Sequence, residues 1–201
     1  MTETEPLLKL DHHLHDRLFE QRTIVLSGPL VDENTLRLCS ALLVLAGDDP
    51  AADIRLLINS PGGSVPGMLA IRDCMRTIPN DVSTVNLGMA YSAGQFLLSS
   101  GAKGKRYTMP NGRVLLHQGS AGIGGTAMDI AIQADGLRKT RDTVLACIAE
   151  DTGQPLQQIE ADSRRDRWFS AAEALDYGFV DAVVEGPELF PAPRRIGLGV
   201  R

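Results

Sequence analysis

The sequence contains no apolar run long enough to cross a membrane. Its longest apolar stretch, residues 41–46, falls far short of the roughly 20 residues that a membrane-spanning helix needs. The first six residues are acidic and polar, which is not the composition of a secretory signal peptide. We therefore expect no association with a membrane and a cytoplasmic location.

Basic residues are neither in excess nor gathered into a stripe. The chain carries 20 Lys and Arg against 25 Asp and Glu, a net charge of −5. Because nucleic-acid-binding domains usually present a basic face, nucleic acid is not an expected partner. No internal repeat is present, and 201 residues with 43% hydrophobic residues can build one domain with a proper core.

Cysteine is scarce, and its spacing does not suit a metal site. Cys39, Cys74 and Cys147 lie in separate apolar segments, where we interpret them as small buried hydrophobic residues. A reducing compartment agrees with this usage. The sequence therefore implies neither a metal nor an organic cofactor.

Strand and helix patterns alternate between residues 23 and 184. Short β-branched or apolar runs predict strands, and apolar residues spaced three or four apart predict helices. Together they predict an α/β fold with a mostly parallel sheet and right-handed crossovers. The predicted strands are 23–26, 54–58, 82–87, 113–117 and 179–184, and the predicted helices are 32–46, 65–78, 92–100, 127–150 and a short one capped by Ser170.

The two ends of the chain differ from this pattern. Residues 1–16 show no periodicity, and residues 187–201 are rich in Pro, Gly and Arg. We expect a flexible N-terminal segment at 1–16, one domain at 17–186 and a loose C-terminal tail at 187–201. In the longest helix, 127–150, we expect Ile130, Leu137 and Ile148 to share one apolar face.

Residues 59–64 (Asn-Ser-Pro-Gly-Gly-Ser) directly follow a predicted strand and precede a helix. Paired glycines let the backbone approach a substrate and direct N–H groups at an anion or a developing oxyanion. A phosphate-binding loop is one alternative, although the G-x-x-x-x-G-K-[ST] pattern is missing. A tight turn without function is the other, and the glycine pair alone favours it.

A second junction, residues 88–94 (Gly-Met-Ala-Tyr-Ser-Ala-Gly), also leads from a strand into a helix. Ser92 would have its hydroxyl at the positive end of the helix dipole with small neighbours around it. The segment resembles the G-x-S-x-G nucleophile elbow, but Ala90 takes the place of the first glycine. A serine that merely caps the helix is an equal alternative from this segment alone.

Histidine is also scarce. His12, His13 and His15 fall in the N-terminal segment, so only His117 is expected in the folded domain. His117 would be the base if the domain performs Ser-His chemistry, and a hydrogen-bonded histidine at a strand end is the alternative. The N-terminal cluster could bind a metal beside Asp11, but a solvated flexible segment is the favoured interpretation.

A third group would have to hold the imidazole of His117 in one tautomer. A carboxylate can accept the Nδ1–H hydrogen bond for this purpose. Local pattern does not choose among the candidates, which are Asp129, Asp135, Asp151, Asp162 and Asp166.

From about residue 32 to residue 184 the chain resembles the ClpP family of compartmentalised serine peptidases. Several motifs in the family's order carry this resemblance. They are 58–65 (Ile-Asn-Ser-Pro-Gly-Gly-Ser-Val), 92–94 (Ser-Ala-Gly), 101–106 (Gly-Ala-Lys-Gly-Lys-Arg), 110–111 (Pro-Asn), 117–118 (His-Gln), 152–155 (Thr-Gly-Gln-Pro), 165–167 (Arg-Asp-Arg) and 170–174 (Ser-Ala-Ala-Glu-Ala).

The resemblance implies a site and a fold. Ser92 and His117 match the family's nucleophile and base, and Asp166 matches its third triad residue. The backbone N–H groups of Gly63 and Ala93 would form the oxyanion hole. The implied fold is the ClpP/crotonase-type spiral of β-β-α units with a protruding long helix, and the implied activity is serine endopeptidase with no cofactor.

The resemblance also implies partners. The family forms two stacked seven-membered rings, a tetradecamer, into which an AAA+ ATPase feeds unfolded polypeptide substrates. The helix from Ala127 would lie at the contact between rings. Residues 119–125, four of which are glycine, would form a flexible strand beside the substrate groove.

Four departures from the family pattern point to a divergent paralogue. Residues 10–19 match the family's N-terminal segment poorly, and residues 55–57 (Arg-Leu-Leu) lack the tyrosine that usually lines the ATPase-docking pocket. Arg164 stands where the family has an acidic residue that pairs across rings, and Gly119 replaces a proline. We therefore expect assembly with a second ClpP-type subunit, whose ring carries most of the ATPase docking.

Three other functions are compatible with the pattern. A ring subunit with a silent triad would have a structural role alone. A Ser-Lys peptidase would use Lys103 or Lys105 in place of His117. A crotonase-type acyl-CoA enzyme would share the fold and an oxyanion hole but would not need Ser92.

Overall fold

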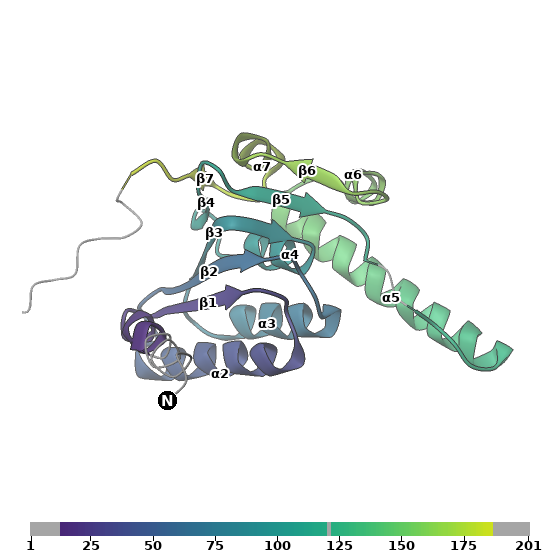
Figure 1. Cartoon of the computed structure of the whole chain (residues 1–201), viewed down its shortest axis with the longest axis horizontal. Coiled ribbons are helices and arrows are strands. Elements are labelled where there is room, and N and C mark those ends of the chain that lie inside the picture. The colour runs from purple at the N-terminus through teal and green to yellow at the C-terminus, as the bar shows by residue number, and fades with distance from the viewer. Residues whose placement is uncertain (1–12, 120–121, 187–201) are drawn as a thin grey trace, which may run out of the picture.

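The described part of the chain, residues 13–119 and 122–186 of a computed structural model, folds around one sheet of seven strands. Figure 1 shows this sheet with helices packed beside it and one long helix projecting from the body. The strands are β1 (Thr23–Ser27), β2 (Ile54–Ser60), β3 (Val82–Tyr91), β4 (Arg106–Thr108), β5 (Arg113–Leu116), β6 (Arg167–Phe169) and β7 (Ala182–Val183). The helices are α2 (Asp32–Asp48), α3 (Val65–Thr77), α4 (Ala93–Ser99), α5 (Ala127–Thr152), α6 (Leu156–Asp162) and α7 (Ala171–Tyr177).

The sheet is mostly parallel. Strands β1, β2, β3, β4 and β7 lie side by side in that order and all pair in parallel. Strand β5 departs from this path, because it pairs in parallel with the far end of β3 and antiparallel with β6. The predicted α/β fold with a mostly parallel sheet is confirmed.

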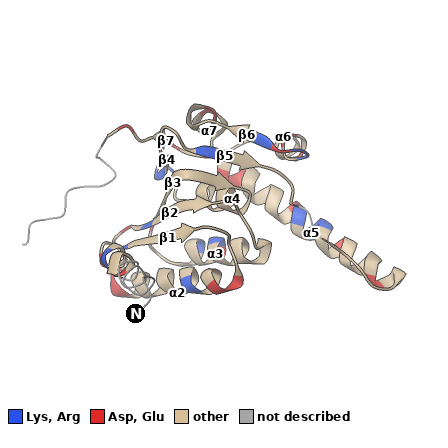
Figure 2. Cartoon of the chain, viewed as in Figure 1, with Lys and Arg blue, Asp and Glu red and all other residues tan. Residues whose placement is uncertain are grey.

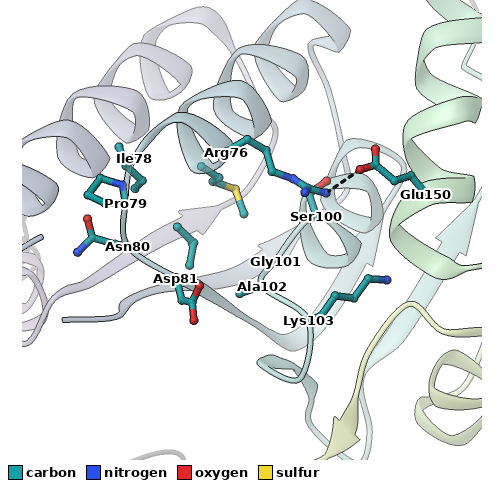
Figure 3. Close-up of a pocket in the computed structure, with 12 residues that line it drawn as sticks. Arg76, Ile78, Pro79, Asn80, Asp81, Ser100, Gly101, Ala102, Lys103 and Glu150 are labelled. Carbon is teal, nitrogen blue, oxygen red and sulfur yellow. Dashed lines mark ion pairs between the residues drawn. The ribbon is translucent and has the colours of Figure 1, made fainter. Parts of the chain in front are cut away.

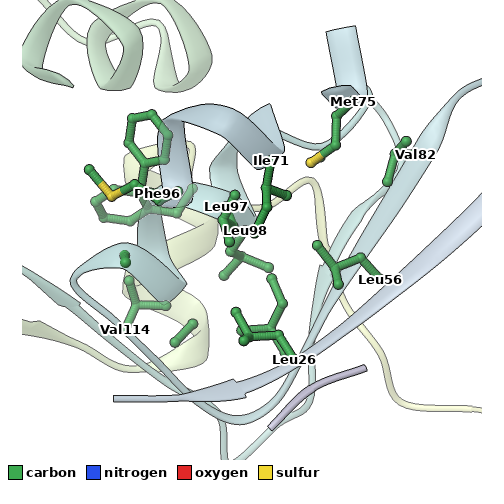
Figure 4. Close-up of a cluster of buried hydrophobic side chains, with 14 of the residues drawn as sticks. Leu26, Leu56, Ile71, Met75, Val82, Phe96, Leu97, Leu98 and Val114 are labelled. Carbon is green, nitrogen blue, oxygen red and sulfur yellow. The ribbon is translucent and has the colours of Figure 1, made fainter. Parts of the chain in front are cut away.

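The core lies between the sheet and helices α2, α3 and α4. Alternate strand residues such as Leu26, Leu56 and Val114 point into it, where they meet Ile71 of α3 and Phe96 of α4 (Figure 4). All seven residues of α4 are buried, so the helix that follows β3 is enclosed by the fold. The C-terminal end of β3 is therefore held by well-packed structure.

Helix α5 differs from the prediction in its packing. It spans 26 residues, but its buried residues, Leu145, Ile148 and Asp151, all lie in its last third. The predicted apolar face is not continuous, because Ile130 and Leu137 are each 40% exposed. The reason is visible in Figure 1, where the N-terminal part of α5 extends beyond the body of the domain.

The remaining differences concern short elements and the chain ends. The sequence did not predict β4, α6 or β6, and the last strand covers only Ala182–Val183 of the expected 179–184. Residues 13–20 form a helix, so the prediction of an irregular segment up to residue 16 is wrong for 13–16. Residues 1–12 and the expected tail, 187–201, lie outside the described residues.

The cysteines are half-buried rather than fully buried. Cys39, Cys74 and Cys147 are free thiols that pack against the core. Burial, together with a hydrogen bond to Cys74, raises the pKa of the Cys39 thiol to about 12. This thiol is therefore protonated at neutral pH and a poor nucleophile.

Among the described residues, none of the helices combines the length and the apolar character needed to span a membrane.

Candidate active site

The two strand-to-helix junctions picked out in the sequence lie against each other. They follow the neighbouring parallel strands β2 and β3, whose carboxyl ends share one edge of the sheet. A Cβ atom placed on Gly62 would lie only 2.7 Å from Cβ of Ser92 and 3.2 Å from the backbone N of Ala93. One placed on Gly94 would lie 3.0 Å from the carbonyl O of Ser60. Glycine at positions 62 and 94 is thus what allows the junctions to touch.

Ser92 has a strained backbone and an uncommitted hydroxyl. Its φ of 56° and ψ of −114° lie in a region that non-glycine residues rarely adopt. It occupies the N-cap position of α4, yet its side chain makes no capping hydrogen bond. Its backbone N–H donates to the carbonyl of Leu115 on β5 at 3.0 Å, which fixes the turn. The alternative of a helix-capping serine is therefore wrong, and the geometry is that of a nucleophile elbow.

Two backbone N–H groups near Ser92 are left without a structural partner within the described residues. The parallel bridge between Leu30 and Gly63 uses the carbonyl of Gly62 and the N–H of Ser64, which omits the N–H of Gly63. Ala93 is the first residue of α4, where a backbone N–H has no acceptor inside the helix. These are the two N–H groups that the resemblance assigns to an oxyanion hole.

His117 lies beside Asp166. The side-chain Nδ1 of His117 is 3.3 Å from Oδ1 of Asp166. The antiparallel pairing of β5 and β6 brings them together, since Leu116 pairs with Arg167 and the two residues come next on each strand. The His117 side chain is 29% exposed and that of Asp166 is 62% exposed. A hydrogen bond from Nδ1–H to the carboxylate would leave Nε2 free to accept a proton.

The other four candidate aspartates are engaged elsewhere. Asp162 illustrates this: burial alone would raise its pKa, but hydrogen bonds from Gln158 and Tyr177 and the charge of Arg167 hold the pKa below its usual value. Such a carboxylate serves the packing of α6 and α7. The remaining partners are Thr126 for Asp129, Lys139 for Asp135 and Arg72 for Asp151.

Ser92 and His117 are neighbours in the sheet, but no hydrogen bond joins them within the described part of the chain. Ser92 follows β3 and His117 follows β5, and these strands pair through Tyr91 and Leu115. A nucleophile and its base often reach hydrogen-bonding distance only when substrate is bound or the active assembly has formed. The single chain therefore holds the three side chains at adjacent strand ends with the last contact open.

The two lysines considered as alternative bases lie at the other end of β3. Lys105 bonds the carboxylates of Asp53 and Asp81, at 2.6 and 2.8 Å, and it precedes the β4 residue that pairs with Thr84. Ser92 lies eight residue steps beyond Thr84 along the chain, roughly 26 Å at the rise of an extended strand. The Lys103 ammonium donates to the backbone carbonyl of Asp151. This placement excludes both lysines as the base for Ser92 in this fold.

A buried ionic cluster holds the C-terminal end of α4. Asp151, 1% exposed, accepts hydrogen bonds from Arg72 at 3.1 and 3.2 Å and from Arg76 at 2.6 Å. The same carboxylate accepts from the hydroxyl of Ser100, just beyond α4, at 2.9 Å. Because a buried carboxylate must be paired, this cluster ties α3, α4 and α5 together.

A cavity of about 290 Å³ lies beside this cluster, far from Ser92. Residues 78–82 and 100–103 line it, together with Met75, Arg76 and Glu150. Figure 3 shows the ion pair between Arg76 and Glu150 at its rim. Because its walls precede β3 and β4, it opens at the edge of the sheet opposite the serine.

Arginines on and near β5 and β6 are accompanied by carboxylates, since Arg167 pairs with Asp162 and Arg164 with Glu160. Figure 2 shows Lys and Arg positions on β5 and β6, which include Arg113 and Arg167. Arg164, one of the departures noted in the sequence, is 70% exposed and reaches Glu160 of the preceding helix α6 at 3.7 Å. An exposed pair of this kind contributes little stability, so Arg164 is available to a partner.

No group of three or more His, Cys, Asp or Glu side chains in the described ranges is arranged to hold a metal ion. Two members of the N-terminal cluster, His13 and His15, are exposed, and His12 lies outside those ranges.

Comparisons with known proteins agree with this arrangement. The model of the Clp protease family matches residues 10–187. The chain is 52% identical to ATP-dependent Clp protease proteolytic subunit 3 of Streptomyces coelicolor over 97% of this chain and 90% of that protein. It is 54% identical to proteolytic subunit 3 of Rhodococcus jostii, over 92% of this chain and 93% of the relative. It is 52% identical to subunit 2 of Corynebacterium glutamicum, over 86% and 87%. A family match that spans most of the chain, on an α/β fold of the expected type, shows that this chain belongs to the Clp protease family.

Proposed function

We propose that this chain is a serine endopeptidase subunit of a Clp-type compartmentalised protease, with Ser92 as nucleophile, His117 as base and Asp166 as the orienting carboxylate. One observation carries the proposal. The strained, uncapped Ser92 directly follows β3, and the strand that pairs with β3, β5, leads into His117 beside Asp166. A serine held at a backbone cost, without a capping role, is expected where the hydroxyl has a chemical task.

The proposed reaction is acyl transfer to Ser92 followed by hydrolysis. His117 Nε2 removes the proton from Ser92 Oγ as the oxygen attacks the carbonyl carbon of a peptide bond. The resulting oxyanion accepts hydrogen bonds from the N–H groups of Gly63 and Ala93. The imidazolium returns its proton to the leaving amine, and Asp166 keeps the ring in the required tautomer. Water, activated by the same imidazole, then releases the acyl group from Ser92. Neither step requires a cofactor in this chain.

We propose that the substrates are unfolded polypeptides delivered by an AAA+ ATPase in the cytoplasm. The names of the relatives, ATP-dependent proteolytic subunits of Clp protease, support this assignment. ATP would then be hydrolysed by the partner, since the chain has no phosphate-binding motif.

A mixed complex with a second ClpP-type subunit fits the chain better than a homomer. Rhodococcus jostii has proteolytic subunits numbered 2 and 3, so a single organism carries more than one such chain. The exposed Arg164 suits an acidic partner residue across a ring contact and would repel its own copy. We therefore propose stacked heptameric rings in which the partner ring carries most of the ATPase docking.

Because no hydrogen bond joins Ser92 and His117 in the described part of the chain, a second candidate function has to be considered. A ring subunit whose triad never closes would have a structural role only. We favour an active subunit because strain at Ser92 has no structural benefit. In this interpretation the last contact forms on assembly.

The test is reaction with a fluorophosphonate probe, which forms a covalent bond to an activated serine. The purified chain would be labelled alone and mixed with a second ClpP-type subunit from the same cell, with Ser92→Ala as control. Labelling of Ser92 in the isolated chain would show a site formed without a partner. Labelling only in the mixture would show assembly by the partner, and no labelling in either would leave the structural role.

A further inference from the structure

A pair of aromatic rings lies next to the proposed site. Tyr91 immediately precedes Ser92, and Trp168 follows Asp166 by two residues. Their ring centroids are 4.9 Å apart and their planes meet at 78°, an edge-to-face contact. Edge-to-face contacts between aromatic rings stabilise a fold beyond the area that they bury. Trp168 is nevertheless 46% exposed, which makes core packing an insufficient reason for a tryptophan there.

The two aromatic residues and Leu115 form one row across the three strands at whose ends the proposed triad lies. Tyr91 of β3 pairs with Leu115 of β5, and Leu115 pairs with Trp168 of β6. Because side chains alternate along a strand, these three residues share one face of the sheet. Their neighbours Val114 and Phe169 point to the opposite, buried face. The Tyr91–Trp168 contact therefore spans β5 and joins its two neighbours directly.

Each residue of the proposed triad lies one or two positions along the chain from a member of this row. Ser92 is one residue beyond Tyr91, His117 two beyond Leu115, and Asp166 two before Trp168. Any sliding or twisting of β6 relative to β3 would change the spacing of Ser92 and Asp166. The aromatic contact resists that movement.

Strand β6 needs such a restraint more than the others do. It consists of three residues and pairs only with β5 in the described sheet. The Asp166 side chain is 62% exposed, so little packing holds it against His117. The guanidinium of Arg167 lies over the rings of Phe169 and Tyr177, which secures the other face of the strand. Trp168 is the residue of β6 that reaches back to the serine strand.

We propose that Tyr91 and Trp168 are positioning residues, whose contact holds the Asp166 strand in register with Ser92 and His117. This inference rests on the proposed function, since it assigns a task within that triad. Trp168 acts through Asp166, and Tyr91 provides the anchor on the serine strand.

The test compares Trp168→Ala with Trp168→Phe in the setting where the wild type is labelled. Fluorophosphonate titration gives the number of reactive sites, and peptide hydrolysis gives kcat per site and KM. We expect Trp168→Ala to lower kcat per site about tenfold with KM within about twofold, since the ring contact is worth up to about 1.5 kcal/mol. Trp168→Phe should restore most of kcat because it keeps a ring. Leu156→Ala, which truncates a side chain of similar exposure (47%) at the start of α6, is the matched control and should change neither constant.

A double-mutant cycle separates positioning from a general loss of stability. If Trp168 acts through Asp166, then Trp168→Ala should cost less than about twofold once Asp166→Asn is present. Equal and additive losses in the two backgrounds would overturn the proposal. So would a wild-type kcat in Trp168→Ala, or an equal loss in Leu156→Ala.

The contact can also be broken from its other side. Trp168 is the single tryptophan of the chain, so intrinsic fluorescence reports its surroundings directly. Tyr91→Leu should shift the emission maximum and lower kcat, and a shifted emission with unchanged kcat would overturn the proposal. Failure of the proposed function would give a different result from failure of this inference. The wild type itself would then show no labelling of Ser92, alone or in the mixture, and the positioning role would be excluded with it.

Discussion

Two serines of this chain occupy the same position in the fold and are held in opposite ways. Ser64 and Ser92 are the N-cap residues of α3 and α4; Ser64 follows β2 after the turn at residues 61–63, and Ser92 directly follows β3. Ser64 has φ −56° and its hydroxyl accepts a hydrogen bond from Gly67 N–H at 3.1 Å. Ser92 has φ +56° and its hydroxyl makes no capping bond.

The comparison teaches how a fold separates a structural serine from a reactive one. A capping hydroxyl is occupied and lowers the energy of its helix. The hydroxyl of Ser92, whose backbone has a positive φ, makes no hydrogen bond to the N–H groups of α4. Burial of α4 offsets the strain in the backbone of Ser92. The surroundings of the two serines also differ. Ser92 follows the strand that pairs with β5, and β5 leads into His117 beside Asp166.

The strongest way to break the comparison is to remove the reactive hydroxyl. Ser92→Ala should abolish probe labelling and lower kcat for peptide hydrolysis about 10⁶-fold, the scale seen when a serine nucleophile is deleted. Its melting temperature should not fall, because the hydroxyl makes no capping bond in the folded chain. Ser92→Gly should be equally inactive but melt higher than Ser92→Ala, since glycine adopts φ +56° without strain. Activity retained in both variants would remove Ser92 from the mechanism.

The next largest effect should come from Asp166, the carboxylate beside His117. Asp166→Asn keeps the shape of the side chain but loses the charge that holds the His117 tautomer. We expect kcat to fall about 10²- to 10⁴-fold, with KM little changed. Hydrolysis assays on the assembled protein provide the measurement, with Asp81→Asn as the control. That variant should leave kcat unchanged, because Asp81 bonds Lys105 at the opposite end of β3.

The contact between the two junctions can be disturbed from the glycine side. Gly62 has φ +105°, and an added Cβ would meet Ser92 Cβ at 2.7 Å and the carbonyl O of Tyr91 at 2.9 Å. Gly62→Ala should lower the free energy of unfolding by about 1–3 kcal/mol and slow labelling of Ser92. Thermal melting and labelling rates measure the two effects. Gly47→Ala, in α2 with nothing within 4 Å of the added atom, is the matched substitution and should leave both unchanged or raise stability slightly.

The smallest effect should come from the structural serine. Ser64→Ala removes the cap of α3 and should cost about 1 kcal/mol in denaturant unfolding. Labelling of Ser92 should proceed at the wild-type rate per folded molecule. Ser64→Asp, which can accept the same Gly67 hydrogen bond, should recover the stability. A Ser64→Ala protein that folds normally but is not labelled at Ser92 would contradict a purely structural role for Ser64.

Long elements with clear periodicity could be predicted from the sequence. Helix α2 and strands β1, β2 and β3 all begin at the expected residues, because the helix has apolar residues at helical spacing and the strands have short β-branched or apolar runs. The elements β4, α6 and β6 could not, since β4 and β6 have only three residues each and α6 is preceded by Pro155 and has no side-chain cap of the kind that marks α7. Strand β6 exists only because β5 offers it a partner some 50 residues earlier in the chain.

Some residues of the candidate site could likewise be predicted from local sequence, and others could not. Ser92 was recognisable from its place between a strand and a helix, and His117 from being the one histidine expected in the domain. Asp166 could not be chosen locally among five aspartates, because its proximity to His117 depends on the β5–β6 pairing. Trp168 was overlooked for the same reason, since its contact with Tyr91 crosses a strand in between. The family resemblance supplied Asp166 where the local pattern could not.

The burial of α4 has a consequence for hydrogen exchange. All seven residues of α4 are enclosed and Ser100 is bound to the buried Asp151, so its hydrogen-bonded amides, from Phe96 onward, should open only when the whole domain unfolds. Strand β6 has three residues and one pairing partner, and its amides should exchange through far smaller local openings. The proposed nucleophile and its carboxylate thus lie beside a strongly protected helix and a weakly protected strand. A binding partner that covers β6 should slow exchange there and raise activity, without altering the protection of α4.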